Sequence, residues 1–182
     1  MMKLKEAITE IIETVITTLV VIYILYTFVA VPELVYGSSM SPTFETGERV
    51  LVEKITKYFR PYDRGEIVVL NPPSNEDVDY IKRVVAIPGD IVKILECKVY
   101  ISNGGVKYML DEYYLLPEEC TQAGVALKEG RALRLQENEY FVLGDNRQNS
   151  ADSRFFGPVQ GVAIVGRVIY RFWPPSNIGF VN

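Results

Sequence analysis

The hydrophobic positions divide the chain into one long apolar run followed by many short alternating segments. The run Val15–Val31 contains no charged residue, and the uncharged stretch extends from Thr14 to Pro32. A helix needs about 20 apolar residues to cross roughly 30 Å of hydrocarbon. A buried core helix would show a polar face, and a cleaved targeting peptide would have a shorter apolar core that ends in small residues. We therefore expect a retained transmembrane helix.

Positive charges lie on one side of this run. Lys3, Lys5 and the terminal amine precede it, and no Lys or Arg follows until Arg49. Because Lys and Arg collect on the cytoplasmic side of a membrane helix, the N-terminus is predicted to be cytoplasmic. The expected division is a short cytoplasmic N-terminus, a membrane anchor and an extracytoplasmic domain, which are residues 1–13, 14–32 and 33–182.

After the apolar run the chain consists of short β-branched segments bounded by turn residues, a pattern that is typical of strands. The predicted strands are Arg49–Ile55, Glu66–Leu70, Tyr80–Ile87, Ile91–Leu95, Cys97–Ser102, Val106–Leu110, Glu139–Leu143 and Val162–Phe172. Pro88-Gly89-Asp90 suits a β-turn, and Asn103-Gly104-Gly105 suits a hairpin. The pattern predicts a mainly β fold, an antiparallel barrel-like domain. The less regular region of about 95–135 is expected to be a smaller inserted β subdomain.

Composition narrows the chemistry. The chain has no histidine, so it can form neither a Ser–His–Asp or Cys–His catalytic group nor a zinc site of the usual His-containing kinds. A hydrolase would have to take its base from Lys, Asp, Glu, Tyr or the N-terminus. The net charge is −4 and there is no basic run, which argues against a nucleic-acid-binding face.

Cys97 and Cys120 are the two cysteines of the chain. Two thiols without a CxxC spacing do not suit a metal site. They form a disulfide if the domain lies outside the cytoplasm, or they are two free, semi-buried thiols. The sequence leaves both alternatives open.

The segment Tyr36–Thr43 (YGSSMSPT) follows the apolar run closely. A Gly-Ser-Ser cluster beside proline is usually an ordinary loop. A serine at this place, however, would be exposed, close to the bilayer and held between a glycine and a proline. Those surroundings suit a nucleophile that acts on a substrate in the membrane.

The predicted strand Tyr80–Val85 (YIKRVV) contains a lysine among apolar residues. Strand alternation places Lys82 on the face of Tyr80 and Val84, and the next residue, Arg83, on the opposite face. Lys82 is then either an edge residue whose amine reaches water or a buried amine. Burial would lower its pKa from about 10.4 and yield a neutral amine that could act as a base.

The segment Gly144–Arg154 (GDNRQNSADSR) holds two Arg and two Asp without Lys or Glu. It follows an apolar strand, and the simplest interpretation is a solvated loop. Arginine, however, presents a planar fork that pairs with carboxylates through two hydrogen bonds. The composition therefore indicates ion pairs of fixed geometry.

At these segments the chain resembles type I signal peptidases, the Ser–Lys leader peptidases. The stretches GSSMSPTF, GERVLVEK, RGEIVVLNPP, YIKRVVAIPGD and GDNRQNSADSRFFGPV match that family's successive motifs in order, over most of Tyr36–Asp90 and Leu143–Arg171. A single S-M-x-P would be weak, whereas the ordered series is highly specific. The resemblance implies a membrane-bound serine endopeptidase that removes N-terminal signal peptides from secreted preproteins after small residues, at Ala-x-Ala. It also implies a β-rich catalytic domain with a smaller β insertion.

The resemblance assigns roles to individual residues. Ser39 matches the nucleophile, which forms an acyl-enzyme, and Lys82 matches the general base. Ser150 matches a hydroxyl that hydrogen-bonds to and orients that lysine. Asp152 and Arg154 match an ion pair that supports the site.

Further positions follow from the same motifs. Arg83 is expected to be a partner of Asp152, and Asp145 and Arg147 match structural positions in the last motif. The residues expected around the oxyanion and the substrate are Ser39, Gly37, Met40, Pro42, Tyr80 and Ile81.

The chain departs from the family pattern at two positions. The family often has Ser or Thr two residues before the nucleophile, where the hydroxyl helps to bind the oxyanion, but this chain has Gly37. The backbone N–H of Ser39 can still serve, and the second donor is another backbone N–H or a water. Gln148 stands where the family often has Asp. With one span evident, the chain resembles the single-anchor members.

The implied partners are the signal peptides of secretory preproteins and the lipid bilayer, with no metal, cofactor or nucleic acid. The implied location is the plasma membrane, or a thylakoid membrane. The oligomeric state does not follow from the sequence. One alternative is a Ser–Lys self-cleaving repressor-type protease, which would carry a DNA-binding module in place of the span. The other is an inactive relative or a membrane-tethered β module that binds peptides, which Gly37 keeps open.

Overall fold

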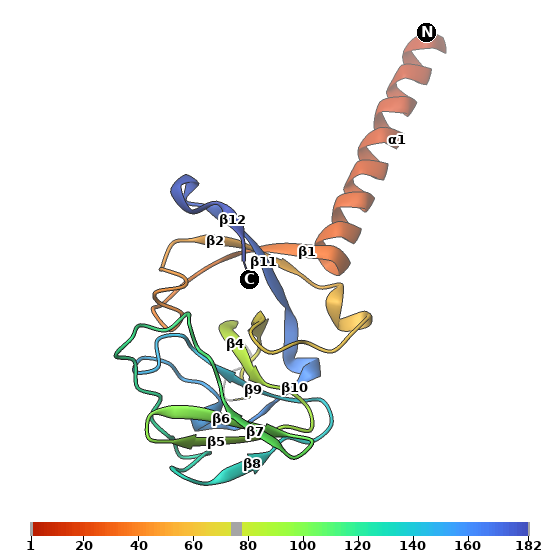
Figure 1. The fold of residues 1–182 in the computed structure, drawn as a ribbon. Coiled ribbons are helices and arrows are strands. Elements are labelled where there is room, and N and C mark those ends of the chain that lie inside the picture. Colours follow the sequence, from red (N-terminus) through yellow and green to blue (C-terminus); the bar gives the residue numbers. More distant parts are fainter. Residues whose placement is uncertain (1, 74–77, 182) are drawn as a thin grey trace.

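Helix α1 (Met2–Ile24) continues as a π-helical segment, Leu25–Val29, and projects away from the β domain (Figure 1). The computed structural model describes residues 2–73 and 78–181, with side chains from Lys5 onward, so Met1 and the Lys3 side chain lie outside it. The span Lys5–Val29 is long and apolar enough to cross a membrane. The expected apolar helix is present, but it begins well before Thr14 and ends at Val29, because the next residues form a strand.

Strand β1 (Ala30–Leu34) follows the helix directly and pairs with β2 (Arg49–Glu53). Lys54, just after β2, stabilises this junction. Its backbone N–H donates to the carbonyl of Val29 at 2.8 Å. The Lys54 amine also donates to the Tyr26 carbonyl at 3.2 Å. The helix is therefore joined to the sheet without an intervening loop.

The main sheet has eight strands, in the order β1-β2-β11-β3-β4-β9-β10, with β12 paired to β11. Its other strands are β3 (Ile67–Leu70), β4 (Tyr80–Ala86), β9 (Glu139–Leu143), β10 (Val159–Gln160), β11 (Ile164–Trp173) and β12 (Gly179–Phe180). Every strand pair in it is antiparallel. The expected mainly β, antiparallel fold is confirmed.

A second, four-stranded sheet has the order β7-β6-β5-β8 and lies at the end of the domain remote from α1 (Figure 1). Its strands are β5 (Ile91–Leu95), β6 (Lys98–Asn103), β7 (Val106–Met109) and β8 (Ala132–Arg134). It therefore includes β5, most of which the expected limits of about 95–135 left in the main domain. Cys97 and Cys120 form a disulfide, which decides between the two alternatives left open by the sequence.

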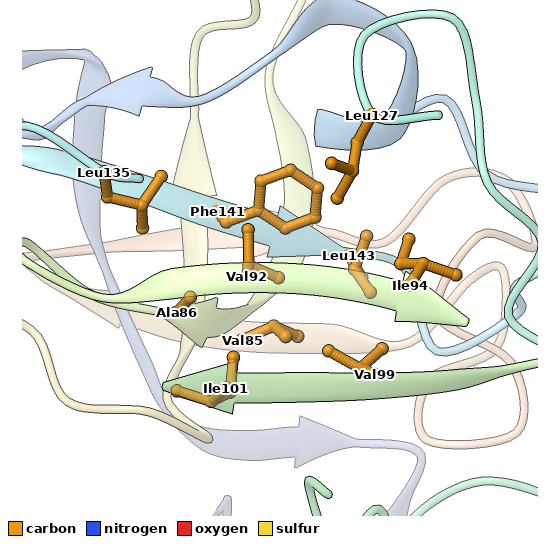
Figure 2. Packing of buried hydrophobic residues seen from close by; sticks show 10 residues of the cluster. All are labelled: Val85, Ala86, Val92, Ile94, Val99, Ile101, Leu127, Leu135, Phe141 and Leu143. Atoms are coloured by element: carbon orange, nitrogen blue, oxygen red, sulfur yellow. The ribbon is translucent and has the colours of Figure 1, made fainter. Parts of the chain in front are cut away.

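The small sheet packs on strands β4 and β9 of the main sheet through one apolar cluster (Figure 2). Its buried members are Val85, Ala86, Val92, Ile94, Val99, Ile101, Leu127, Leu135, Phe141 and Leu143. Strand β4 thus contributes to this core while it also carries the lysine singled out above. Packing on both faces fixes the position of the strand, because close-packed cores tolerate little displacement.

Helical structure elsewhere is short: α2 (Ser153–Phe156) and the 3₁₀ turns Thr56–Tyr58, Gly161–Ala163 and Pro175–Asn177. Both predicted turns are present. The N–H of Asp90 donates to the Ile87 carbonyl at 3.1 Å, and Gly104-Gly105 connects β6 to β7. All eight predicted strands exist with small shifts at their ends, whereas β1, β8, β10 and β12 were not predicted.

Candidate active site

Ser39 lies in the turn that follows β1. The turn is made by Gly37, whose φ of +88° falls in the left-handed region that glycine adopts without strain. On the far side of Ser39, Met40 and Phe44 are fully buried in the core of the main sheet. These two anchors hold a half-buried serine at the surface of the domain.

Lys82 projects from the middle of β4 and is buried, with 2% of its surface exposed. Its Nζ atom donates to Ser39 Oγ at 2.9 Å and to the Ile81 carbonyl at 2.8 Å. The Tyr80 ring centroid lies 4.9 Å from the same nitrogen. Of the two alternatives for this lysine, the structure therefore shows the buried amine.

Burial lowers the pKa of Lys82 from its ordinary value of 10.5 to about 8. Desolvation is the main cause, because it disfavours the charged form of an amine. The carboxylates of Asp152 and Asp145 act in the opposite direction. Each of them is paired with an arginine, so neither is left to neutralise an ammonium at Lys82.

Arg83 pairs with Asp145 and not with Asp152. Its Nε donates to Asp145 Oδ1 at 2.9 Å and its second nitrogen to Oδ2 at 2.7 Å, and both side chains are buried. The expected Arg83–Asp152 pair was wrong for a reason of register. Arg83 is paired with Leu143 across β4 and β9, so the residue two positions beyond Leu143 lies on the same side as the arginine.

Asp152 and Arg154 form the expected ion pair, with two hydrogen bonds of 2.8 Å. Asp152 also caps the short helix α2 by accepting from the N–H of Arg154, and it accepts from the N–H of Gly144 at 3.1 Å. One carboxylate thus satisfies a guanidinium and two backbone donors. Such a fully satisfied buried group fixes the end of β9 relative to α2.

Ser150 differs from its expected role. Its hydroxyl is buried and makes no hydrogen bond within the described part of the chain, so it does not orient Lys82 in this structure. It packs instead on Gly144, where an added Cβ would lie 2.3 Å from Ser150 Oγ and 2.4 Å from the Ser39 carbonyl oxygen. Only glycine allows this close approach of the last motif to the nucleophile segment.

Arg147 is buried and is held by residues of the irregular segment between β7 and β8. It donates to Glu112, to Thr121 and to the Gly144 carbonyl. The Tyr114 ring from the same segment lies 3.9 Å from the guanidinium carbon of Arg83. Local sequence carries no signal for these contacts, because Glu112, Tyr114 and Thr121 belong to no motif and no periodic pattern.

Three other contacts were missed although their residues lie inside the motifs. Thr43 donates to Asp145 at 2.5 Å. Asn146 and Asn149 hydrogen-bond to Ser38. The available signal was that both segments, Tyr36–Thr43 and Gly144–Arg154, are rich in polar residues. Which of these residues contact one another could be known only from the fold.

A groove of about 400 Å³ runs past Ser39 and Lys82 between β1 and the start of β4. The predicted site residues that line it are Gly37, Ser39, Met40, Tyr80, Ile81 and Lys82. Pro42 is exposed and lies outside this lining. Glu33 and Asp79 also line the groove, and burial, followed by the charge of Asp79, raises the pKa of Glu33.

The edge of β4 that borders the groove is open. The strand pairs with β3 from Tyr80 onward but with β9 only from Arg83 onward. Within residues 2–73 and 78–181 there is no group of three His, Cys, Asp or Glu side chains placed to hold a metal ion. The arrangement offers a free strand edge, a hydroxyl and a neighbouring amine that can exchange a proton with it.

Comparison with known proteins gives consistent matches. The model of the family "Signal peptidase, peptidase S26" matches residues 8–173. The chain is 36% identical over 175 residues to "Probable signal peptidase I-2" of Synechocystis sp., covering 93% of this chain and 75% of that protein. It is 37% identical over 183 residues to "Signal peptidase I S" of Bacillus subtilis, covering 98% and 96%. It is 32% identical over 183 residues to "Signal peptidase IB" of Staphylococcus aureus, covering 96% and 94%.

Proposed function

The chain belongs to the signal peptidase family, peptidase S26, and is a serine endopeptidase of that family; we propose that Ser39 is its nucleophile and Lys82 its general base. The observation that carries this proposal is the 2.9 Å contact between Ser39 Oγ and a lysine amine that is buried and has a pKa lowered to about 8. At pH 7 roughly a tenth of such amines are neutral, about 300-fold more than at the ordinary pKa.

The reaction uses the amine twice. Neutral Lys82 accepts the hydroxyl proton of Ser39 while Oγ attacks the scissile carbonyl carbon. The C–N bond then breaks, the leaving amine takes the proton from Nζ, and the signal peptide remains as an ester on Ser39. A water molecule that gives its proton to Lys82 attacks this ester, and the proton returns to Ser39 as the peptide leaves with a free carboxylate.

We place the substrate in the groove as an added strand. The free edge of β4 at Tyr80–Lys82 offers backbone hydrogen bonds to an extended segment. In a strand the first and third residues before the cleaved bond point to the same wall. That wall contains Val69 and Ile81, and we propose that these apolar side chains select small residues such as the two alanines of Ala-x-Ala.

The enzyme is membrane-anchored, with one N-terminal apolar helix. We propose that the N-terminus is cytoplasmic and that the β domain lies outside the cytoplasm, at a plasma membrane or a thylakoid membrane. The disulfide between Cys97 and Cys120 supports this orientation, because such bonds persist in oxidising compartments. The substrate is then the signal peptide of a preprotein held in the same bilayer, which raises the effective concentration of the cleavage site.

The alternative of an inactive peptide-binding module is not favoured. Gly37 raised it by removing a hydroxyl, yet the hydroxyl–amine pair needed for chemistry is present. The self-cleaving repressor alternative requires a DNA-binding module, whereas the N-terminal element is an apolar helix. The family matches agree with the enzymatic interpretation.

The test uses the full-length protein in detergent or vesicles with an Ala-x-Ala preprotein. Ser39→Ala and Lys82→Met are each expected to reduce kcat about 10⁴-fold or more, since members of a catalytic unit fail together. Ser41→Ala, whose hydroxyl instead donates to Glu45, and Lys98→Met at an exposed position are the matched controls. Full activity in the Ser39 or the Lys82 variant would reject the proposed pair.

A further inference from the structure

The two carbonyls on either side of the nucleophile's N–H group are held by one asparagine. Asn146 Nδ2 donates to the Ser38 carbonyl at 3.1 Å, and the backbone N–H of Asn146 donates to the Ser39 carbonyl at 3.0 Å. The Ser41 N–H adds a second hydrogen bond to the Ser38 carbonyl at 3.1 Å. The loop after β9 therefore grips the nucleophile segment by its backbone.

The orientation of the Asn146 amide is itself fixed. Its Oδ1 atom accepts from the N–H of Asn149 at 3.2 Å, so Nδ2 is the atom left to face the Ser38 carbonyl. Asn149 reaches the same segment independently, because its Nδ2 donates to Ser38 Oγ at 2.6 Å. Two side-chain amides from one loop thus hold the residue just before the nucleophile.

Holding the Ser38 carbonyl sets the direction of the next N–H. A peptide unit is planar and trans, so the carbonyl of Ser38 and the N–H of Ser39 point in opposite directions. The N–H of Ser39 makes no hydrogen bond to any residue that the structure describes. It is thereby turned away from Asn146 and left available to a ligand.

This hold from outside the turn adds to an internal one, the hydrogen bond from the Ser41 N–H to the Ser38 carbonyl. Gly37 is the hinge before Ser38, and a glycine at φ +88° restricts the following peptide less than any other residue would. Gly37 also has no hydroxyl that could share the oxyanion. The Ser39 N–H therefore carries a larger part of the stabilisation, and Asn146 adds a hold on its direction from outside the turn.

We infer that Asn146 is a positioning residue that aims the Ser39 N–H at the oxyanion of the acyl-transfer transition state. The inference rests on the proposed function, in which Ser39 attacks a peptide carbonyl. Asn149 is a second support that holds Ser38 through its side chain and leaves the carbonyl lock in place. Asn146 itself touches neither the substrate nor the reacting atoms.

The test replaces Asn146 by leucine, which removes the donor at similar volume, and by aspartate, which keeps the shape and places an acceptor against the Ser38 carbonyl. Both variants keep the backbone N–H that bonds Ser39. Each is expected to lower kcat about 100-fold with KM unchanged, comparable to the loss of one oxyanion donor. Asn149→Ala is expected to lower kcat only a few-fold. Gln148→Leu, exposed in the same loop, is the matched control and is expected to have no effect.

Two further measurements separate aiming from a merely structural role. A peptide boronate ending in Ala-x-Ala forms a tetrahedral adduct with serine, and its affinity is expected to fall about 100-fold in the Asn146 variants, in step with kcat. The affinity for the cleaved signal peptide and the pH midpoint of kcat/KM are expected to remain unchanged. If peptide affinity falls equally, or if the midpoint moves, the inference is overturned.

The failure of this inference is distinguishable from that of the proposed function. Wild-type kcat in Asn146→Leu and Asn146→Asp, together with an inactive Ser39→Ala, would remove the positioning role and leave the nucleophile in place. An active Ser39→Ala would remove both. Should the leucine variant not fold, the near-isosteric aspartate variant still decides, because it changes a single donor into an acceptor.

Discussion

Two regions of the molecule are both buried from water, but one contains charged side chains and the other contains apolar side chains. The region behind Lys82 buries paired charges, and Arg83, Asp145, Asp152 and Arg154 are each at most 2% exposed. The region under the small sheet buries a cluster of ten apolar side chains, Ile94 among them. The comparison teaches that apolar packing fixes a volume, whereas buried ion pairs with two hydrogen bonds fix direction as well.

The difference has an energetic side. Burial of an apolar side chain stabilises the fold by about 1.5–3 kcal/mol, so the small sheet contributes stability. Burial of charge costs free energy unless each ion is paired and hydrogen-bonded. Lys82, which has a hydroxyl and a carbonyl but no carboxylate partner, is therefore the residue whose burial opposes stability and serves reactivity.

The largest expected effect is the loss of one buried ion. Asp145→Ala leaves the Arg83 guanidinium without its carboxylate and is expected to destabilise the domain by about 4 kcal/mol. Urea unfolding, followed by the fluorescence of the single tryptophan, Trp173, measures it. The double variant Asp145→Ala with Arg83→Leu should lose less than Asp145→Ala alone. A single-variant loss below about 1 kcal/mol would erase the contrast between the regions.

The matching change in the small sheet is Ile94→Ala, at a position with no exposed surface. Removal of this side chain is expected to cost about 3 kcal/mol of unfolding free energy. The kcat of the folded fraction should stay within about twofold, because the change removes volume and no directed contact. Val106→Ala, in the same sheet but exposed, is the control. A large fall in kcat at unchanged stability would contradict this division of labour.

The disulfide tests whether the regions are coupled. Cys97 and Cys120 are 23 positions apart, and closing a loop of that size is expected to contribute about 3 kcal/mol. The double Cys→Ala variant should lose this amount in an unfolding experiment, and a reductant should then have no further effect. Because Thr121 follows Cys120 and bonds Arg147, a small fall in kcat is also expected. Unchanged stability would show that apolar packing alone holds the small sheet.

Replacing the buried amine should act in the opposite direction. Lys82→Met is expected to be inactive yet more stable than the natural protein by about 2 kcal/mol at pH 7. The cost of burying Lys82 is full below its folded pKa of about 8 and vanishes as pH rises to the ordinary 10.5. The stability difference should therefore shrink between pH 8 and 10.5. A destabilised variant at pH 7 would refute the assignment of Lys82 as the strained group.

The smallest effect is a pH dependence of rate. Only the neutral amine can accept the serine proton, so kcat/KM should reach a plateau above pH 8 and fall about tenfold per pH unit below it. The slope corresponds to about 1.4 kcal/mol per unit. Ile94→Ala should leave this midpoint in place, because the side chains that pack around Ile94 in its cluster are apolar. A midpoint near 10 would show that burial does not lower the pKa of Lys82.

Local pattern was enough to predict most of the fold. Alternation gave the strands, and Pro88-Gly89 gave a turn. It failed at β1, because Ala30–Leu34 extends the apolar run without a break and Pro32 argues against a strand. Proline is tolerated there because β1 lies at the edge of the sheet, next to β2 in the order of the described strands.

The sequence motifs were enough to identify the residues of the site. They were not enough to identify contacts that depend on the register between strands. Lys82 and Ser39 were identified together, and they lie in contact. The partner of Arg83 was misassigned, because only the pairing of β4 with β9 decides which aspartate it meets. The contacts of Glu112 and Thr121 with Arg147 could not be predicted, because a contact between an irregular segment and a distant loop produces no pattern in the local sequence.

The direct junction between Val29 and Ala30 sets a mechanical limit on the enzyme. No loop separates the helix from β1, and Lys54 hydrogen-bonds to the last turn of the helix. These connections restrict rotation of the β domain relative to the helix. Each residue of a helix corresponds to a rise of about 1.5 Å and a rotation of about 100°. The covalent chain and the Lys54 contacts therefore hold the groove at one distance and in one direction from the last turn of the helix.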